Sequence, residues 1–122
     1  MRFLVMADRP DDFATWIARQ RQPAAPPATA QASRGETVFM GAPCPVCHAI
    51  QGTRALASAG PDLTHLGSRQ SIAAGWLPRD VATLHAWIIN APSLKPGVKM
   101  PQLIWFNGPE LHDLVAYLEG LK

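Results

Sequence analysis

The sequence lacks the features that would place it in several common classes. Only two of its 122 residues are cysteine, Cys44 and Cys47, and no further cysteine is present to complete a metal site with them. There is no run of basic residues and the formal net charge is only +2, so nothing indicates a nucleic-acid partner. Every apolar run is shorter than the roughly 18 to 20 residues that span a bilayer. We therefore expect no membrane contact through this chain alone.

A secretory signal peptide is also missing from the first residues. The apolar part of "MRFLVMADRPDD" is short, and acidic residues follow it at once. We therefore expect either a cytoplasmic protein or a piece of a longer one. The chain is 48% hydrophobic and 16% charged, which is typical of one modest globular domain. A cofactor would help so small a chain to build a core.

Composition divides the chain into three zones. Residues 22–32 are uncharged and rich in proline and alanine, which predicts a semi-rigid linker of partly polyproline character. They separate a short first zone, residues 1–21, from a third zone, residues 33–122. The first zone is too small to be a domain and reads as the end of one. The third zone is the expected folded domain.

The first zone predicts one strand and one helix. Residues 2–8 read as the strand, and Pro10 with Asp11 is expected to open the helix. The apolar residues of that helix share one face at the i, i+3, i+4 spacing: Phe13, Trp16 and Ile17.

The third zone shows helical periodicity, with neither alternating strands nor an internal repeat, and predicts an all-α fold. Ser33 with Glu36 fits a capping box that starts a helix leading to the cysteines. Asp80 is expected to cap a second helix that ends before Pro92. Pro109 suits the first position of the last helix. The apolar face of that helix is predicted at Leu111, Leu114, Val115, Leu118 and Leu121.

Cys44, Cys47 and His48 admit three interpretations. A redox dithiol requires a strand–helix context that this zone does not show. A closed zinc site requires four ligands, usually as two spaced pairs, and the remaining histidines are far apart. Covalent c-type haem requires two thiols and an adjacent imidazole in this order. We favour haem, with two structural thiols beside an unrelated histidine as the ordinary alternative.

The iron held by His48 needs a sixth ligand or an open face. Met100 stands in "KPGVKMPQL", where Pro96, Gly97 and Pro101 can fix a loop around one thioether. We therefore expect Met100 to be the ligand rather than a surface methionine. His/Met ligation raises the potential of the iron relative to two histidines. The less favoured candidates are Met40, which we expect in the core, and His65, His85 and His112.

With these motifs in view, residues 34–122 resemble a class I cytochrome c. "CPVCH" matches the haem-attachment motif of that family, and "KPGVKMP" matches its methionine loop. The resemblance implies that the first and last helices of the domain cross. Their contact would be formed by Gly35 and Phe39 with Leu114 and Tyr117.

The same resemblance assigns roles to three further residues. "GPDLTHLGSR" is similar to the family's stretch after the haem-attachment turn, where Pro61 would offer its carbonyl oxygen to the second ring nitrogen of His48. Arg69 and Trp87 match positions that approach a haem propionate. For Trp87, a place in the core is the simpler alternative.

The first zone resembles the end of the copper domain of cytochrome c oxidase subunit II. Some bacterial members carry a cytochrome c domain after a linker of this kind, and the order here is the same. The resemblance implies that Met1 is the last ligand of a binuclear copper centre whose other ligands lie upstream, in a longer parent chain. Met1 as an ordinary start residue is the alternative.

Two functions remain open from these resemblances. The haem domain of an oxidase subunit II would pass electrons to the copper centre, while a free periplasmic class I cytochrome c would only carry them. The first implies other oxidase subunits as partners and a small cytochrome or a quinol–cytochrome c reductase as donor. It also implies the periplasmic face of the bacterial inner membrane, reached through the parent chain. We expect that this chain itself makes and breaks no substrate bonds. In an oxidase, oxygen would be reduced in another subunit.

Overall fold

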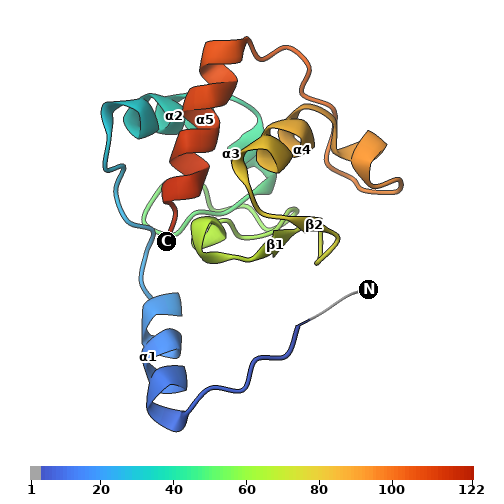
Figure 1. Cartoon of the computed structure of the whole chain (residues 1–122). Helices are drawn as coiled ribbons and strands as arrows, with labels where there is room; N and C mark the ends of the chain where they lie inside the picture. Colours follow the sequence, from blue (N-terminus) through green and yellow to red (C-terminus); the bar gives the residue numbers. More distant parts are fainter. Residues whose placement is uncertain (1–3) are drawn as a thin grey trace.

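The structure, a computed structural model, describes residues 4–122, and its folded body is helical. Three helices form the body: α2 (Ala30–Gly41), α4 (Val81–Leu94) and α5 (Gly108–Gly120). The single-turn α3 (Cys44–Cys47) and the 3-10 turn η1 (Leu66–Ser68) lie in the loops between them. Figure 1 shows α1 (Pro10–Gln20) outside this body, below it in that view. The expected all-α class is confirmed.

Within the described residues, paired strands are limited to one short hairpin, which lies outside the predicted strand. Strand β1 (Ser71–Ile72) pairs antiparallel with β2 (Leu77–Pro78) in a short hairpin. Residues 4–8, part of the predicted strand 2–8, form no strand, and residues 2 and 3 lie outside the described part. A strand needs a neighbour to satisfy its backbone groups, and no segment among residues 4–122 pairs with this one. The prediction of a strand there is wrong for residues 4–8.

Helix α2 begins earlier than the Ser33 capping box predicts. The side chain of Thr29 is the N-cap and accepts a hydrogen bond from the amide of Ala32 at 3.0 Å. Ser33 lies one turn inside the helix, where its hydroxyl donates to the Thr29 carbonyl at 3.2 Å. Both residues fit the pattern of a cap, and burial of Ala32 against the core favours the earlier one.

The other helix starts have strong local caps. Asp80 caps α4 as expected, accepting from the amide of Thr83 at 2.8 Å. Asn107 and Glu110 form a capping box at the start of α5, with Pro109 in its first turn. Helix α4 continues past Pro92 to Leu94, because a kink at Asn90 joins a second turn to it.

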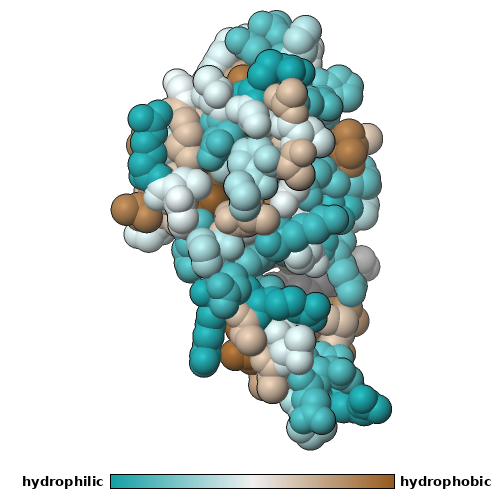
Figure 2. Space-filling view, turned by 90° about the vertical axis from the view of Figure 1, so that its left-hand side faces the viewer, coloured by the Kyte–Doolittle hydropathy of each residue, from teal (hydrophilic) through white to brown (hydrophobic). Residues whose placement is uncertain are grey.

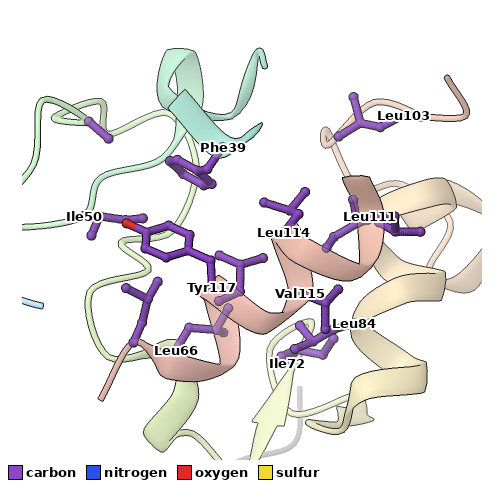
Figure 3. Packing of buried hydrophobic residues seen from close by; sticks show 14 residues of the cluster. Phe39, Ile50, Leu66, Ile72, Leu84, Leu103, Leu111, Leu114, Val115 and Tyr117 are labelled. Atoms are coloured by element: carbon purple, nitrogen blue, oxygen red, sulfur yellow. The ribbon is translucent and has the colours of Figure 1, made fainter. Parts of the chain in front are cut away.

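The core is built around the crossing of α2 and α5. A Cβ atom at position 35 would collide with the carbonyl oxygen of Asp113 and lie 2.8 Å from the Cβ of Tyr117. Glycine therefore allows the two backbones to touch. The rings of Phe39 and Tyr117 pack beside this point, with centroids 5.9 Å apart, as Figure 3 shows. The crossed contact implied by the resemblance is present.

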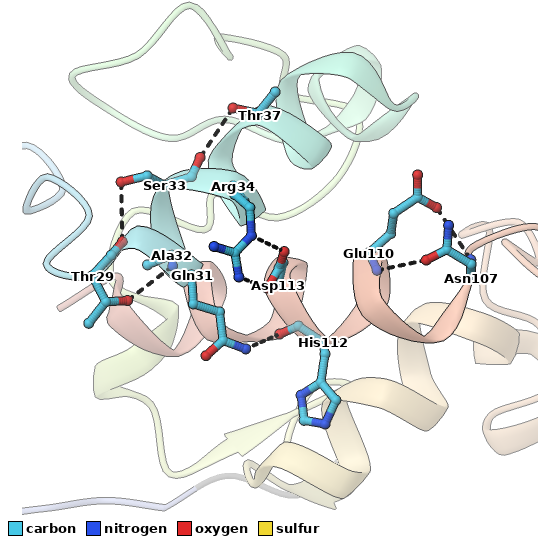
Figure 4. A network of polar contacts seen from close by, with 10 residues as sticks. All are labelled: Thr29, Gln31, Ala32, Ser33, Arg34, Thr37, Asn107, Glu110, His112 and Asp113. Carbon is cyan, nitrogen blue, oxygen red and sulfur yellow. Dashed lines mark hydrogen bonds and ion pairs between the residues drawn. The ribbon is translucent and has the colours of Figure 1, made fainter.

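Polar contacts reinforce the same crossing on its solvent side (Figure 4). Arg34 donates to both carboxylate oxygens of Asp113, at 2.7 and 3.0 Å. Hydrogen bonding from Arg34 lowers the pKa of Asp113 below its usual value. The side-chain amide of Gln31 also donates to the carbonyl of His112 at 3.5 Å. Because solvent screens an exposed pair of this kind, it orients the helices more than it stabilises them.

The segment after α1 docks on the body rather than hanging free. The amide of Ala24 donates to the carbonyl of Gln51 at 3.0 Å, and the His65 ring bonds the carbonyl of Gln22 at 3.1 Å. Helix α1 itself buries no residue, and its Phe13 and Trp16 rings stack at 5.8 Å in solvent. The face seen in Figure 2 is mostly hydrophilic, with apolar residues in small separate spots. Within residues 4–122 no helix has the length and apolar character that crossing a membrane requires.

Candidate functional site

Cys44 and Cys47 begin and end the single turn α3. Side chains three positions apart lie on the same side of a helical turn, so the two thiols face the same region. Both cysteines are free and half-buried. The amide of His48 donates to the carbonyl of Cys44 at 3.0 Å and closes the turn. The sequence "CPVCH" therefore folds into a compact turn that presents two thiols and one imidazole.

The ring of His48 is held in one orientation. Its Nδ1 lies 2.7 Å from the carbonyl oxygen of Pro61. A carbonyl can only accept, so Nδ1 carries the proton and Nε2 is left as the ring nitrogen that can bind a metal. A Cβ at Gly60 would lie 2.7 Å from Cε1 and 2.9 Å from Nδ1 of the ring. Gly60 thus provides the space in which the imidazole sits.

Met100 lies on the loop between α4 and α5. It is half-buried and packs against the same apolar core as Cys44. Gly97 in this loop has a φ of +88°, a conformation that side chains other than glycine rarely adopt. The loop returns to α4 where the amide of Leu103 donates to the carbonyl of Ile89 at 2.9 Å. The structure thus brings the cysteine turn and Met100 to one core.

The apolar side chains around this core fit a large apolar group. Several pack against the buried core and are themselves only partly buried: Met40, Leu63, Trp87, Ile89, Met100 and Phe106. An apolar group laid over such side chains would remove their remaining surface from water. Together with the free Nε2 of His48 and the paired thiols, these residues fit a haem attached at α3.

The geometry gives little support to the other interpretations of the cysteines. Burial raises the pKa of the Cys44 thiol to about 11, whereas a redox dithiol requires an easily formed thiolate. Within residues 4–122 no three His, Cys, Asp or Glu side chains gather into a set that could hold a metal ion. A closed zinc site therefore lacks its second pair of ligands in the described structure.

The remaining ligand candidates have other contacts. Met40 packs against the core. His65 bonds the carbonyl of Gln22 at 3.1 Å. His85 on α4 and His112 on α5 pack edge to face, with ring centroids 5.0 Å apart. The Nε2 of His85 is buried there without a hydrogen-bond partner.

Trp87 and Arg69, the two residues predicted near a propionate, differ from each other in burial and contacts. Trp87 is half-buried on α4 and packs against the core. Arg69 is exposed, and its guanidinium donates to the carbonyl of Asp62, while its own carbonyl accepts from Arg79 at 2.6 Å. Met1, the predicted copper ligand, lies outside the described residues.

Sequence reasoning missed a brace of hydrogen bonds next to Pro61, formed by Gln51, Asp62 and Thr64. The Thr64 hydroxyl is buried, donates to the Asp62 carboxylate at 2.5 Å and accepts from the Gln51 amide at 2.9 Å. Burial by itself would raise the pKa of Asp62, but hydrogen bonds from Thr64, together with Gln51 and the charge of Arg69, lower the pKa overall. The signal was the Asp-x-Thr spacing, which is typical of local side-chain turns. This brace holds the segment that presents the Pro61 carbonyl to His48.

Comparison with known proteins agrees with this geometry. The family model described as Cytochrome c matches residues 32–122. A protein of Alkalihalophilus pseudofirmus named cytochrome c oxidase subunit 2 is 34% identical over 122 residues, covering 100% of this chain and 35% of its own length.

Two further relatives carry the same name. The protein of Bacillus subtilis is 30% identical over 129 positions, covering 100% of this chain and 35% of its own length. That of Bacillus sp. (strain PS3) is 32% identical, covering 92% of this chain and 32% of its own length. The chain thus spans about a third of the length of these curated relatives. With a family match over most of the chain and an attachment turn of this geometry, the chain belongs to the cytochrome c family.

Proposed function

We propose that residues 33–122 form an electron-transfer domain that binds haem c covalently through Cys44 and Cys47. When bound, the haem supplies an iron that takes up and releases one electron at a time. The observation that carries the proposal is the fixed ring of His48, whose Nδ1 is engaged by Pro61 and whose Nε2 is free. Membership of the cytochrome c family supports it.

The residues of this chain would set the properties of that iron. His48 and Met100 are the proposed axial ligands, and an imidazole with a thioether favours the reduced state. The bond to the Pro61 carbonyl keeps the His48 ring in one tautomer and one orientation. With His48 and Met100 bound, a small molecule would have to displace one of these side chains before it could bind the iron. Arg69 and Trp87 are proposed to approach the propionates.

The first test concerns the ligands. In the oxidised holoprotein, Met100→Ala should abolish the long-wavelength sulfur–iron absorption band and lower the reduction potential. Met40→Ala, which removes another half-buried methionine, is the matched control and should keep the band. His48→Ala should prevent a stable holoprotein, because attachment and ligation act together. A band that survives in Met100→Ala would show that another residue is the ligand.

We further propose that the chain is the C-terminal part of a cytochrome c oxidase subunit 2. The name of the three relatives and the full coverage of this chain by two of them support the proposal. Residues 1–21 would then end the copper domain, with Met1 as a copper ligand, and residues 22–32 would be the linker. Electrons would pass from a small cytochrome or a reductase through this domain to the copper centre and the other oxidase subunits.

Native membranes provide the test of this second proposal. Denaturing electrophoresis with haem staining should detect a covalent-haem polypeptide that reacts with an antibody to residues 33–122 and is much larger than 13.2 kDa. It should co-purify with oxygen-reducing activity and lie on the periplasmic face of the inner membrane. A haem-stained band at the mass of this chain alone, free of oxidase activity, would instead indicate a free carrier.

A further inference from the structure

The kink in α4 results from one side chain and one missing donor. Asn90 has a non-helical φ of −151° and ψ of 64°. Pro92 has no N–H and cannot bond the carbonyl of Ile88. The amide oxygen Oδ1 of Asn90 accepts from the amide of Ser93 at 3.3 Å, as an N-cap does. A second helical turn therefore starts beyond Asn90 and leads into the loop that carries Met100.

This kink frees a backbone carbonyl at the place where the loop returns. In an unbroken helix the carbonyl of Ile89 would accept from the amide of Ser93, four residues further on. Asn90 occupies that amide, so the carbonyl of Ile89 accepts instead from Leu103 at 2.9 Å. Leu103 is only 4% exposed and anchors the end of the loop in the core.

Gln102 adds a second bond at the same point. Its side-chain amide donates to Oδ1 of Asn90 at 2.9 Å. The Oδ1 atom of Asn90 therefore makes two bonds. It caps the helical turn that leads into the methionine loop, and it binds Gln102, which lies two positions after Met100. The start of the loop has a separate tether, since the Lys95 ammonium donates to the carbonyl of Ala73 at 2.5 Å. Between these two contacts the backbone at Gly97 is conformationally permissive, so the position of the loop depends on the contacts at both of its ends.

We infer that Asn90 is a positioning residue for Met100, because its amide oxygen closes the methionine loop onto α4 and restricts the departure of the thioether from the iron. The inference rests on the proposed function, since it takes Met100 as the iron ligand. Asn90 itself acts through Gln102 and through the carbonyl of Ile89.

The test measures how often the sulfur leaves the iron. Imidazole is mixed with the oxidised holoprotein, and the rate at which it replaces Met100 is followed by the loss of the sulfur–iron band. Asn90→Ala should raise this rate about tenfold, because two hydrogen bonds are lost together. Asn90→Asp should stay within about twofold of wild type, because a carboxylate accepts the same two bonds.

Two glutamine variants separate loop closure from general softening. Gln102→Leu removes only the bond to Asn90 and should raise the rate about threefold. Gln31→Leu removes an exposed glutamine that bonds the carbonyl of His112, far along the chain from the loop, and should leave the rate unchanged. Hydrogen exchange at the Leu103 amide should quicken in Asn90→Ala and Gln102→Leu alone.

The outcomes distinguish this inference from the ligand assignment. If the band of the wild type does not depend on Met100, the assignment itself is wrong and the inference goes with it. If the band depends on Met100 but imidazole replaces Met100 in Asn90→Ala at the wild-type rate, only the positioning role of Asn90 is wrong. An Asp variant as fast as the Ala variant would also overturn it. Should Asn90→Ala yield no holoprotein, Gln102→Leu decides: a wild-type rate there rejects the inference.

Discussion

At the scale of single residues, the space beside His48 is the most constrained feature of the site. Gly60→Ala should force the imidazole to move, because the new Cβ would lie 2.7 Å from its Cε1. We expect the holoprotein to lose about 1 to 3 kcal/mol of stability and its reduction potential to change. Urea titration and potentiometry would measure these effects. Gly108→Ala, where nothing lies within 4 Å, is the matched control. Equal behaviour of the two variants would contradict the prediction.

The lowered pKa of His85 leads to a second prediction at this scale. Burial, and then the neighbouring His112, lower the pKa of His85 below its usual 6.5. The folded state therefore binds fewer protons than the unfolded state, and stability falls as the pH drops through 6.5 towards the lowered value. His85→Phe should reduce this dependence of stability on pH. His112→Gln should reduce it only in part, because His85 stays buried. Unfolding by urea at pH 7 and pH 5 would measure it. An unchanged slope in His85→Phe would contradict the assignment.

At the scale of elements, the α2–α5 crossing depends on the absence of one side chain. Gly35→Ala should destabilise the holoprotein by at least about 2 kcal/mol, because its Cβ would collide with the Asp113 backbone and push the helices apart. Gly41→Ala, on the same helix with nothing within 4 Å, should instead be neutral or stabilising by up to about 1 kcal/mol. Thermal unfolding compares them, and a Gly35 variant as stable as the Gly41 variant would refute the close contact.

The elements also show how far the sequence alone could predict the structure. Local signals were sufficient at Asp80 and along the apolar face of α5, since a cap and a helical stripe depend on near neighbours. They were insufficient at Ser33, because Thr29 is also a residue type that caps helices and the burial of Ala32 favours it, although only Ser33 has a glutamate three residues later. The kink at Asn90 depends on Gln102 and Leu103, which no local pattern relates to it.

At the scale of the whole molecule, several apolar side chains that pack against the core are only half-buried. We expect the double variant Cys44→Ala, Cys47→Ala, expressed without haem, to lose cooperative unfolding and near-UV circular dichroism, because half-buried residues such as Trp87 and Phe106 stay uncovered. The covalent holoprotein is the control. A haem-free protein that unfolds cooperatively near the same temperature would show that the polypeptide is sufficient for the fold.

The crossing of α2 and α5 also orders events during synthesis. These helices come from opposite ends of the domain, and their contact closes the core. Because a growing chain is made from its N-terminus, α2 and the α3 turn exist for some seconds before Leu121 has been added. Until then Tyr117 is not yet available to pack against Phe39. The contact that closes the core therefore cannot form until the last helix has been made, although most of the residues that it joins are present earlier.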